Sequence, residues 1–409
     1  MKVGIIGGGA AGIMAAVNIK KYNKDIEVVI HEKNQKLGKK LLATGNGRCN
    51  YTNADIDVKY YHSNDENLKN ILKEFGFEKC ILFFKSLGIE PVNKNSYIYP
   101  MSEQAFSILN AFELKIRELG VKVISDCDID EIEYGKKIKL KSKNNTYSYD
   151  SVLISCGGLA SSELNYNDTL YPVLKRKGYS IVKPLAALCP VVPIDLKRLK
   201  KTEGVRVKSA VSLYINDKLY SKEKGELQFT KNYLSGIVIF QLSRYISRAL
   251  ENKQKVELGI DFLPSVDDKF EFFNDRYRIL KNYKLKDFAN GVINNKLWEE
   301  IVTELEFNIN DTVKANFIKK ISDKVSDCRY EIKESAGLLR AQVSTGGVSL
   351  SDINMNTMES KLHKNIYFAG EVLDIDGICG GYNLHWAWAS GYLAAKNIAS
   401  RDIDDTSKH

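Results

Sequence analysis

Three glycines near the N-terminus have the spacing of a nucleotide-binding turn. Gly7, Gly9 and Gly12 form the pattern G-x-G-x-x-G between an apolar segment, KVGII, and a helix-like segment, IMAAVNIKKY. The first glycine permits a tight bend, the second lets the backbone approach a pyrophosphate, and the third lets helix and strand pack closely. Glu32 ends the next apolar segment, IEVVIHE, where a carboxylate can accept hydrogen bonds from ribose hydroxyls. This pattern predicts a dinucleotide site made of Gly7, Gly9, Ala10, Ala11, Gly12 and Glu32.

Two further glycine-containing segments could hold the rest of a long cofactor. The first, KNQKLGKKLLATGNGRCN, places lysines beside a second glycine turn, and the second, IYFAGEVLDIDGICGGYNLHW, ends in a glycine pair that opens a helix. The free N–H groups of a helix N-terminus stabilise negative charge by roughly 0.3–2 kcal/mol. We expect cofactor contacts from Lys33, Lys40, Gly45, Gly47, Arg48, Cys49 and Asn50, and from Gly380, Gly381, Tyr382, Asn383 and Leu384.

These segments together resemble the BaiN-like (YhiN-like) family of FAD-dependent oxidoreductases, also described as aminoacetone-oxidase-family FAD-binding enzymes. The resemblance covers nearly the whole chain, because VLISCGG, GELQFT and VSTGGVSLSDINMNTMESK also fit. It implies FAD, which we expect to be bound non-covalently, with Glu371 near ribitol or phosphate oxygens. Where relatives have FTH and SGP this chain has FTK and SGI, so no family role is carried over there. The resemblance adds Gly370 and Glu371 to the expected cofactor contacts, and we further add Cys127, Gly157 and Gly158.

The segments between the motifs alternate in the manner of an α/β protein. SEQAFSILNAFELKIREL has helical periodicity, VKVIS and SVLISC are typical of buried strands, and the stretch between these two strands alternates like antiparallel strands. We predict a Rossmann-type FAD-binding domain in two parts, 1–185 and 335–409. The predicted insertion at 186–334 is a mixed β-barrel and helical domain, with strands at about 186–262 and helices at about 263–324.

Composition narrows the class of protein further. A chain of 409 residues is long enough for two or three domains. No stretch of about eighteen apolar residues occurs, and the seven cysteines form no C-x-x-C pair, which predicts a cytoplasmic protein without a membrane span. The net charge is +9, but the densest basic run, LKRLKKTEGVRVK, has no interleaved aromatic residues. We therefore expect a solvated face and no nucleic-acid partner.

The leading functional hypothesis is an FAD-dependent oxidoreductase. It would transfer hydride between NAD(P)H or a small organic donor and a small unsaturated, carbonyl or amine-type substrate. The candidate catalytic residues are Arg48, as a contact for an anionic group, and Cys49. The reacting cleft should lie between the flavin loops, 45–50 and 380–384, and the insertion, which would exclude water.

Two alternatives stay open. One is flavin-linked thiol–disulfide chemistry through Cys49 and Cys379, although no C-x-x-C pair supports it. The other is an FAD-containing nucleic-acid-binding or sensor protein, favoured by the basic balance alone. Trp386 and Trp388 have the pattern of core residues in the last helix, and for His385 a structural role and proton transfer both stay open. The sequence does not decide the substrate, the electron donor and acceptor, or the oligomeric state.

Overall fold

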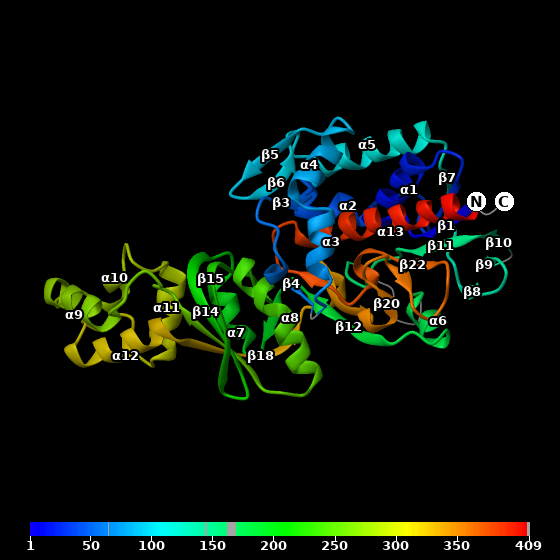
Figure 1. The fold of residues 1–409 in the computed structure, drawn as a ribbon. Coiled ribbons are helices and arrows are strands. Elements are labelled where there is room, and N and C mark those ends of the chain that lie inside the picture. The colour runs from blue at the N-terminus through cyan, green and yellow to red at the C-terminus, as the bar shows by residue number, and fades with distance from the viewer. Residues whose placement is uncertain (64, 144, 162–168, 407–409) are drawn as a thin grey trace. The chain divides into compact units, whose positions relative to one another are not determined.

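The computed structural model describes residues 1–63, 65–143, 145–161 and 169–406, which form two compact units (Figure 1). Unit 1 comprises Met1–Pro184 and Val343–His409, and unit 2 comprises Leu185–Gln342. The sequence places the second boundary at 334. In the structure strand β18 (Cys328–Ser335) is part of the barrel of unit 2, and a 3₁₀ turn, Leu338–Arg340, follows it before the chain re-enters unit 1. The boundary therefore lies after residue 342.

Unit 1 is built around a seven-stranded sheet in the order β20-β21-β22-β11-β1-β2-β7. The strands from β22 to β7 are parallel, and β20 and β21 add an antiparallel edge. The first two strands are buried almost throughout, as expected of parallel strands covered on both faces. The strands are β1 (Lys2–Ile6), β2 (Glu27–His31), β7 (Lys122–Ile124), β11 (Ser151–Ile154), β20 (Ile353–Asn354), β21 (Glu359–Ser360) and β22 (Ile366–Phe368).

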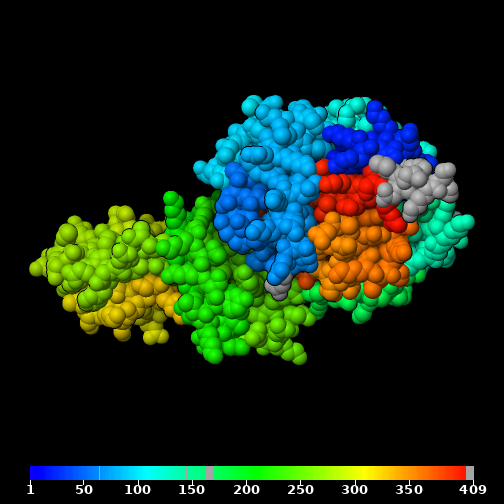
Figure 2. Space-filling view, viewed as in Figure 1, coloured from blue at the N-terminus to red at the C-terminus, as the bar shows by residue number. Residues whose placement is uncertain are grey.

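The first and last helices of unit 1 lie against each other. A Cβ on Gly391 of α13 (Tyr382–Thr406) would come within 2.5 Å of the Ala11 carbonyl of α1 (Ala10–Tyr22), so the small residue permits the close approach. The blue and red surfaces of these segments are adjacent in Figure 2. Trp386 and Trp388 are buried, and their indole N–H groups donate to the carbonyls of Gly370 (3.1 Å) and Tyr51 (2.9 Å). The expectation that both tryptophans serve the core is confirmed.

Small sheets and helices complete unit 1. The most important for the site is the sheet β3-β6-β5, because it brings residues of two distant segments beside the start of α13. The sheets are β3 (Thr52–Asn53), β5 (Pro91–Lys94) and β6 (Tyr97–Pro100); β4 (Tyr61–His62) and β23 (Asp376–Gly377); and β8 (Glu131–Glu133), β9 (Ile138–Ser142) and β10 (Asn145–Tyr149). The helices are α2 (Lys39–Ala43), α3 (Leu68–Glu74), α4 (Phe77–Lys85), α5 (Ala105–Glu118) and α6 (Tyr171–Arg176), and β12 (Ile181–Ala187) and β19 (Val343–Val348) form a two-stranded sheet.

Unit 2 contains a closed six-stranded barrel in the order β13-β16-β15-β14-β17-β18. Its hydrophobic core includes residues of both the barrel strands and the helices of this unit. The predicted fold class, a Rossmann-type α/β fold with a mixed barrel and helical part, is confirmed. The other barrel strands are β13 (Val191–Pro193), β14 (Arg206–Ile215), β15 (Lys218–Phe229), β16 (Leu234–Ser235) and β17 (Val256–Asp261). The helices are α7 (Leu196–Thr202), α8 (Ile237–Glu251), α9 (Lys269–Leu280), α10 (Leu285–Phe288), α11 (Asn295–Glu304) and α12 (Ala315–Ser326). None of the helices in the described part of the chain has the length and hydropathy to cross a bilayer.

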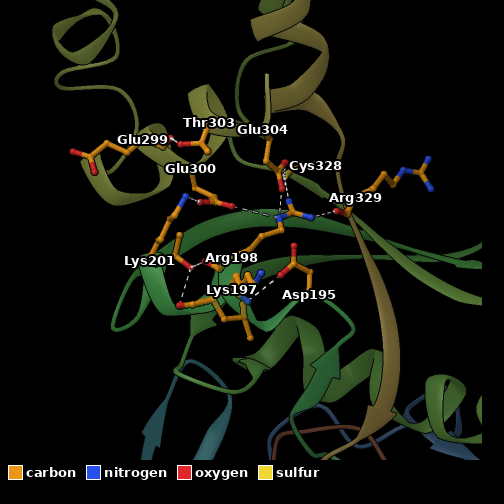
Figure 3. A network of polar contacts seen from close by, with 12 residues as sticks. Asp195, Lys197, Arg198, Lys201, Glu299, Glu300, Thr303, Glu304, Cys328 and Arg329 are labelled. Atoms are coloured by element: carbon orange, nitrogen blue, oxygen red, sulfur yellow. Dashed lines mark hydrogen bonds and ion pairs between the residues drawn. The ribbon is translucent and has the colours of Figure 1, made fainter. Parts of the chain in front are cut away.

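One arginine of the basic run, Arg198, is only slightly exposed, and its guanidinium is held in a polar cluster of unit 2 instead of facing solvent (Figure 3). The Arg198 guanidinium carbon lies 3.7 Å from the centre of the Tyr330 ring, and Nη1 donates to the Arg329 carbonyl at 2.7 Å. Its Nε is ion-paired with Glu304 and lies 3.7 Å from a Glu300 oxygen. The cluster thus joins α7, α11 and β18, and the run 196–208 is not one continuous basic surface.

Candidate functional site

The first glycine turn leaves open space at one position. Gly7 has φ +97°, and a Cβ there would come within 2.5 Å of the Ser155 carbonyl. At Gly12 a Cβ would come within 2.0 Å of the Gly7 carbonyl, so both positions require glycine for packing. A Cβ at Gly9 would meet no atom within 4 Å. Since Gly9 precedes the N-terminus of α1, where N–H groups are free, an anion such as a pyrophosphate fits there.

Glu32 is fixed at the end of β2 by the turn beside it. One carboxylate oxygen accepts the Gly8 N–H at 2.8 Å, and the other accepts the backbone and side-chain N–H groups of Asn34 at 2.8 and 2.6 Å. The Cys127 N–H donates to the Glu32 carbonyl at 2.9 Å. A carboxylate oxygen can accept more than one hydrogen bond, so Glu32 keeps capacity for ribose hydroxyls. Lys33 is exposed beside it.

A polar cluster, which we call the Glu371 cluster, joins Lys40, Gly158, Ser344 and Glu371. One Glu371 oxygen accepts the Ser344 N–H (2.8 Å) and hydroxyl (3.0 Å). The other lies 3.2 Å from the Lys40 ammonium, which also donates to the Gly158 carbonyl at 3.4 Å. A Cβ on Gly158 would come within 2.1 Å of the Ser344 hydroxyl. The structure therefore brings together three residues that the sequence analysis expects to contact the cofactor: Lys40, Gly158 and Glu371. Glu371 also holds two protein loops together.

The second glycine turn has an unusual backbone. Four residues of Thr44–Cys49 are left-handed: Gly45 (φ +56°), Asn46 (+54°), Gly47 (+81°) and Cys49 (+58°). The Thr44 carbonyl accepts the Cys49 N–H at 3.0 Å and closes the turn. Asn50 follows directly, and its side-chain oxygen is buried without a hydrogen-bond partner among the described residues. A buried oxygen without a partner is costly, so the Asn50 oxygen is available to a donor from outside the chain, a ligand or a water.

The glycine pair before α13 meets the second turn at Asn50. Gly380 and Gly381 have φ +129° and +91°, and a Cβ on Gly381 would come within 2.6 Å of the Thr52 carbonyl and 2.9 Å of the Asn50 oxygen. The Asn53 amide donates to the Gly380 carbonyl at 2.9 Å and fixes the turn. Hydrogen bonding within α13 starts from the His385 N–H, which reaches the Gly381 carbonyl. The preceding N–H groups, those of Tyr382, Asn383 and Leu384, lie in the first turn of α13, where N–H groups lack intrahelical acceptors.

The residues present fit FAD. The open space at Gly9 suits the pyrophosphate, Glu32 suits the adenosine ribose, and the unpaired Asn50 oxygen suits an N–H of a flavin ring. When bound, FAD would supply hydride transfer, and the first turn of α13 would stabilise the negative charge of its reduced form. Asn383 supports this turn instead of facing a ligand, since its side chain bonds both the N–H and carbonyl of Gly377 at 2.8 Å.

Cys49 does not have the surroundings of a catalytic thiol. It is fully buried, and burial raises its pKa to about 12, so the thiol stays protonated at neutral pH. Burial likewise raises the pKa of Cys379 to about 12, and both are free cysteines. The proposed catalytic role of Cys49 is therefore corrected to a structural one, and the thiol–disulfide alternative loses its support.

We expect Cys49 to resist a thiol reagent such as DTNB in the folded protein. Its burial and raised pKa both suppress the thiolate that attacks the reagent. Peptide mapping should find Cys49 unlabelled in native buffer and labelled after denaturation in guanidinium. Rapid native labelling that abolishes turnover would restore the thiol hypothesis.

Arg48 lies at the rim of the second turn. Its Nε donates to the Gly45 carbonyl at 3.2 Å, and its guanidinium carbon is 5.3 Å from the centre of the Tyr99 ring. Glu103 approaches at 4.0 Å, and the Arg48 side chain is 46% exposed. Arg48 is thus accessible to an anionic group.

Of the two roles open to His385, the structure favours the structural one. Its ring is buried between the Thr52 hydroxyl (2.8 Å) and the Phe75 carbonyl (2.9 Å), and burial lowers its pKa to about 4. Sequence reasoning missed Thr52, Asn53 and Ser344 as supports of the site. Thr52 and Asn53 lie two and three residues after a quoted motif and Ser344 lies inside one, but the partner of each is distant in the chain.

The fold and the site define a Rossmann-type FAD-dependent oxidoreductase. The chain belongs to the HI0933-like Rossmann family, whose model matches residues 1–397. It is 35% identical to a 3-dehydro-bile acid delta(4,6)-reductase of Clostridium scindens, over 98% of this chain and 99% of that protein. It is 27% identical to a ribosomal RNA dihydrouridine synthase of Haemophilus influenzae, over 97% and 98%. A flavocytochrome c3 fumarate reductase structure aligns with a TM-score of 0.50 at 16% identity, over 98% of this chain and 78% of that one. The resemblance inferred from the motifs is confirmed, and the fold is that of flavoproteins.

Proposed function

We propose that this protein reduces a carbon–carbon double bond conjugated to a carbonyl group. The observation that carries the proposal is the buried, unpaired Asn50 oxygen beside the glycine pair that opens α13, an arrangement that suits a flavin, in a chain with full-length relatives named for such reductions. A delta(4,6)-reductase of a 3-dehydro bile acid and a dihydrouridine synthase each saturate a double bond of an unsaturated carbonyl compound. A small-molecule acceptor is the first candidate because of the greater identity to the bile-acid reductase.

We further propose that FAD is held non-covalently, that NAD(P)H donates the hydride, and that the protein acts in the cytoplasm. The cysteines and histidine nearest the proposed flavin loops support non-covalent binding, because Cys49 is buried and both ring nitrogens of His385 are already bonded. All seven cysteines are free, which suits a reducing compartment. Arg48 is proposed as a contact for an anionic group of the substrate.

The second candidate acceptor is a uracil base in RNA. Lys208, Lys222 and Lys224 are exposed, and no ion pair joins them to any described residue. In the β14–β15 register Ser212 faces Lys222 and Ala210 faces Lys224, so these lysines share one face of the sheet. Positive charge of this kind suits a phosphate backbone.

We expect the purified protein to be yellow and to be reduced by NADH or NADPH under anaerobic conditions. A 3-oxo-4,6-diene bile acid should then reoxidise the flavin in a single turnover, followed by absorbance near 450 nm. A uracil-containing RNA hairpin, offered in the same assay, tests the second candidate. Reoxidation by RNA alone selects the second candidate, and reoxidation by oxygen but by neither unsaturated acceptor rejects the proposed reaction.

A further inference from the structure

We propose that Tyr97 is the proton donor of the reduction, an inference that rests on the proposed function. Saturating a conjugated double bond requires a hydride at one carbon and a proton at its neighbour. A bound FAD would supply the hydride, and a protic side chain beside the flavin loops can supply the proton by general acid catalysis. Three observations favour Tyr97: it lies beside the start of α13, its hydroxyl is protonated and unbonded, and the neighbouring protic groups are buried or already hydrogen-bonded.

Tyr97 lies beside the turn that opens α13. It is the first residue of β6, and across the sheet it pairs with Asn53, whose amide donates to the Gly380 carbonyl at 2.9 Å. A Cβ on Gly380 would come within 2.8 Å of the Tyr97 ring. The ring therefore borders the helix start to which we assign the flavin. Since strand neighbours alternate between faces, Ile98 points away from this turn and is buried on the other side.

Tyr97 is partly exposed and its phenol is uncommitted. The hydroxyl forms no hydrogen bond with any residue that the structure describes. Burial of part of the ring raises the pKa of the phenol, and nearby Cys379 and Tyr99 act in the same direction. The phenol is thus protonated at neutral pH and can donate to a substrate.

Other protic groups around the two flavin loops are buried or engaged. Cys49 and Tyr51 are fully buried, and Tyr382 is 4% exposed. The Tyr60 hydroxyl donates to Asp55. The Arg48 guanidinium is accessible, but a guanidinium does not release its proton in the ordinary pH range.

The proposed step balances as follows. The new C–H bond at the β-carbon of the unsaturated carbonyl compound takes its hydride from the reduced flavin. The new C–H bond at the α-carbon takes the proton of Tyr97 Oη, whose O–H bond breaks. The phenolate then regains a proton from water, and the carbonyl compound leaves saturated.

The test compares Tyr97→Phe with Tyr60→Phe, which removes a neighbouring phenol. Each FAD-loaded variant is reduced anaerobically and mixed with the 3-oxo-4,6-diene bile acid, the uracil-containing hairpin, or oxygen. Tyr97→Phe should lower the rate of reoxidation by the unsaturated acceptor at least about 100-fold. Its FAD content and its reaction with oxygen should match the wild type, because neither requires the phenol. Tyr60→Phe should stay within about 2-fold of the wild type in every assay.

A second readout does not depend on turnover. In protein labelled with 3-fluorotyrosine, the Tyr97 resonance, assigned by its absence in Tyr97→Phe, should shift when the bile acid or hairpin that reoxidises the wild type is added to the oxidised enzyme. A wild type that reacts with neither unsaturated acceptor overturns the proposed function and this inference together. A reactive wild type whose Tyr97→Phe variant keeps more than half of its rate overturns the assignment of Tyr97 alone.

Discussion

Gly9→Val should give a folded protein without FAD. The Val side chain would occupy the open space before α1, because nothing in the structure lies within 4 Å of a Cβ at this position. That is the space where the pyrophosphate must approach the backbone. Gly9 has φ −81°, which a valine can adopt, and the loss of a favourable N-terminal residue costs only about 1 kcal/mol. Absorbance near 450 nm should fall to background while circular dichroism retains the native spectrum.

Two other glycine variants separate cofactor loss from misfolding. Gly12→Val should fail to fold, because its Cβ would lie 2.0 Å from the Gly7 carbonyl. Gly135→Val changes an exposed glycine between β8 and β9 and should keep its full FAD content. A yellow, fully loaded Gly9→Val protein would remove Gly9 from the cofactor site.

Local patterns in the sequence predict the cofactor loops because each loop is determined by its own residues. The positive φ values at Gly7 and Gly381 and the close contact at Gly12 demand glycine, so the requirement is visible as a motif. The fold class followed for the same reason, since parallel buried strands and amphipathic helices alternate along the chain.

The parts that the sequence did not predict depend on partners far apart in the chain. Tyr97 meets Gly380 only because β3 and β6 pair, and neither strand carries a motif. Ser344 lies in β19, and the path of this strand brings its N–H within hydrogen-bond distance of Glu371. The sequence analysis proposes a catalytic Cys49 because the residue stands in a predicted cofactor loop. In the structure its backbone is left-handed and its side chain is fully buried. Burial is a property of the fold and not of the motif.

The basic run at 196–208 illustrates the same limit in unit 2. Lysine and arginine spacing alone predicts a solvated face, but Arg198 is 14% exposed and its guanidinium lies over the Tyr330 ring. The acidic residues that receive it, Glu300 and Glu304, lie a hundred residues later on α11. Lys201 and Lys324 each approach one of these carboxylates, so each carboxylate has a lysine partner in addition to Arg198.

Arg198→Met should destabilise unit 2 by about 1.5 to 3 kcal/mol, the range for hydrogen bonds of a charged group, because Glu304 and the Arg329 carbonyl both lose the guanidinium while Lys201 and Lys324 still pair the two carboxylates. The substitution keeps an unbranched apolar side chain but loses the contact with Glu304 and the hydrogen bond to the Arg329 carbonyl. Adding Glu304→Leu should restore much of the stability, since apolar replacements of both partners can pack together. Arg206→Met is the matched control: its ion pair with Glu226 is exposed on both sides, and its loss should cost less than about 1 kcal/mol.

Urea denaturation followed by far-ultraviolet circular dichroism measures these differences, and FAD release reports unit 1 in the same titration. We expect Arg198→Met to lose the structure of unit 2 at a lower urea concentration than the wild type, while FAD release follows its original midpoint. Equal midpoints for Arg198→Met and Arg206→Met would show that the buried cluster contributes no more than a surface pair. The double variant could instead remain as unstable as Arg198→Met. That result would show that Arg198 acts mainly through the Tyr330 ring and the Arg329 carbonyl, because Glu304→Leu restores neither contact.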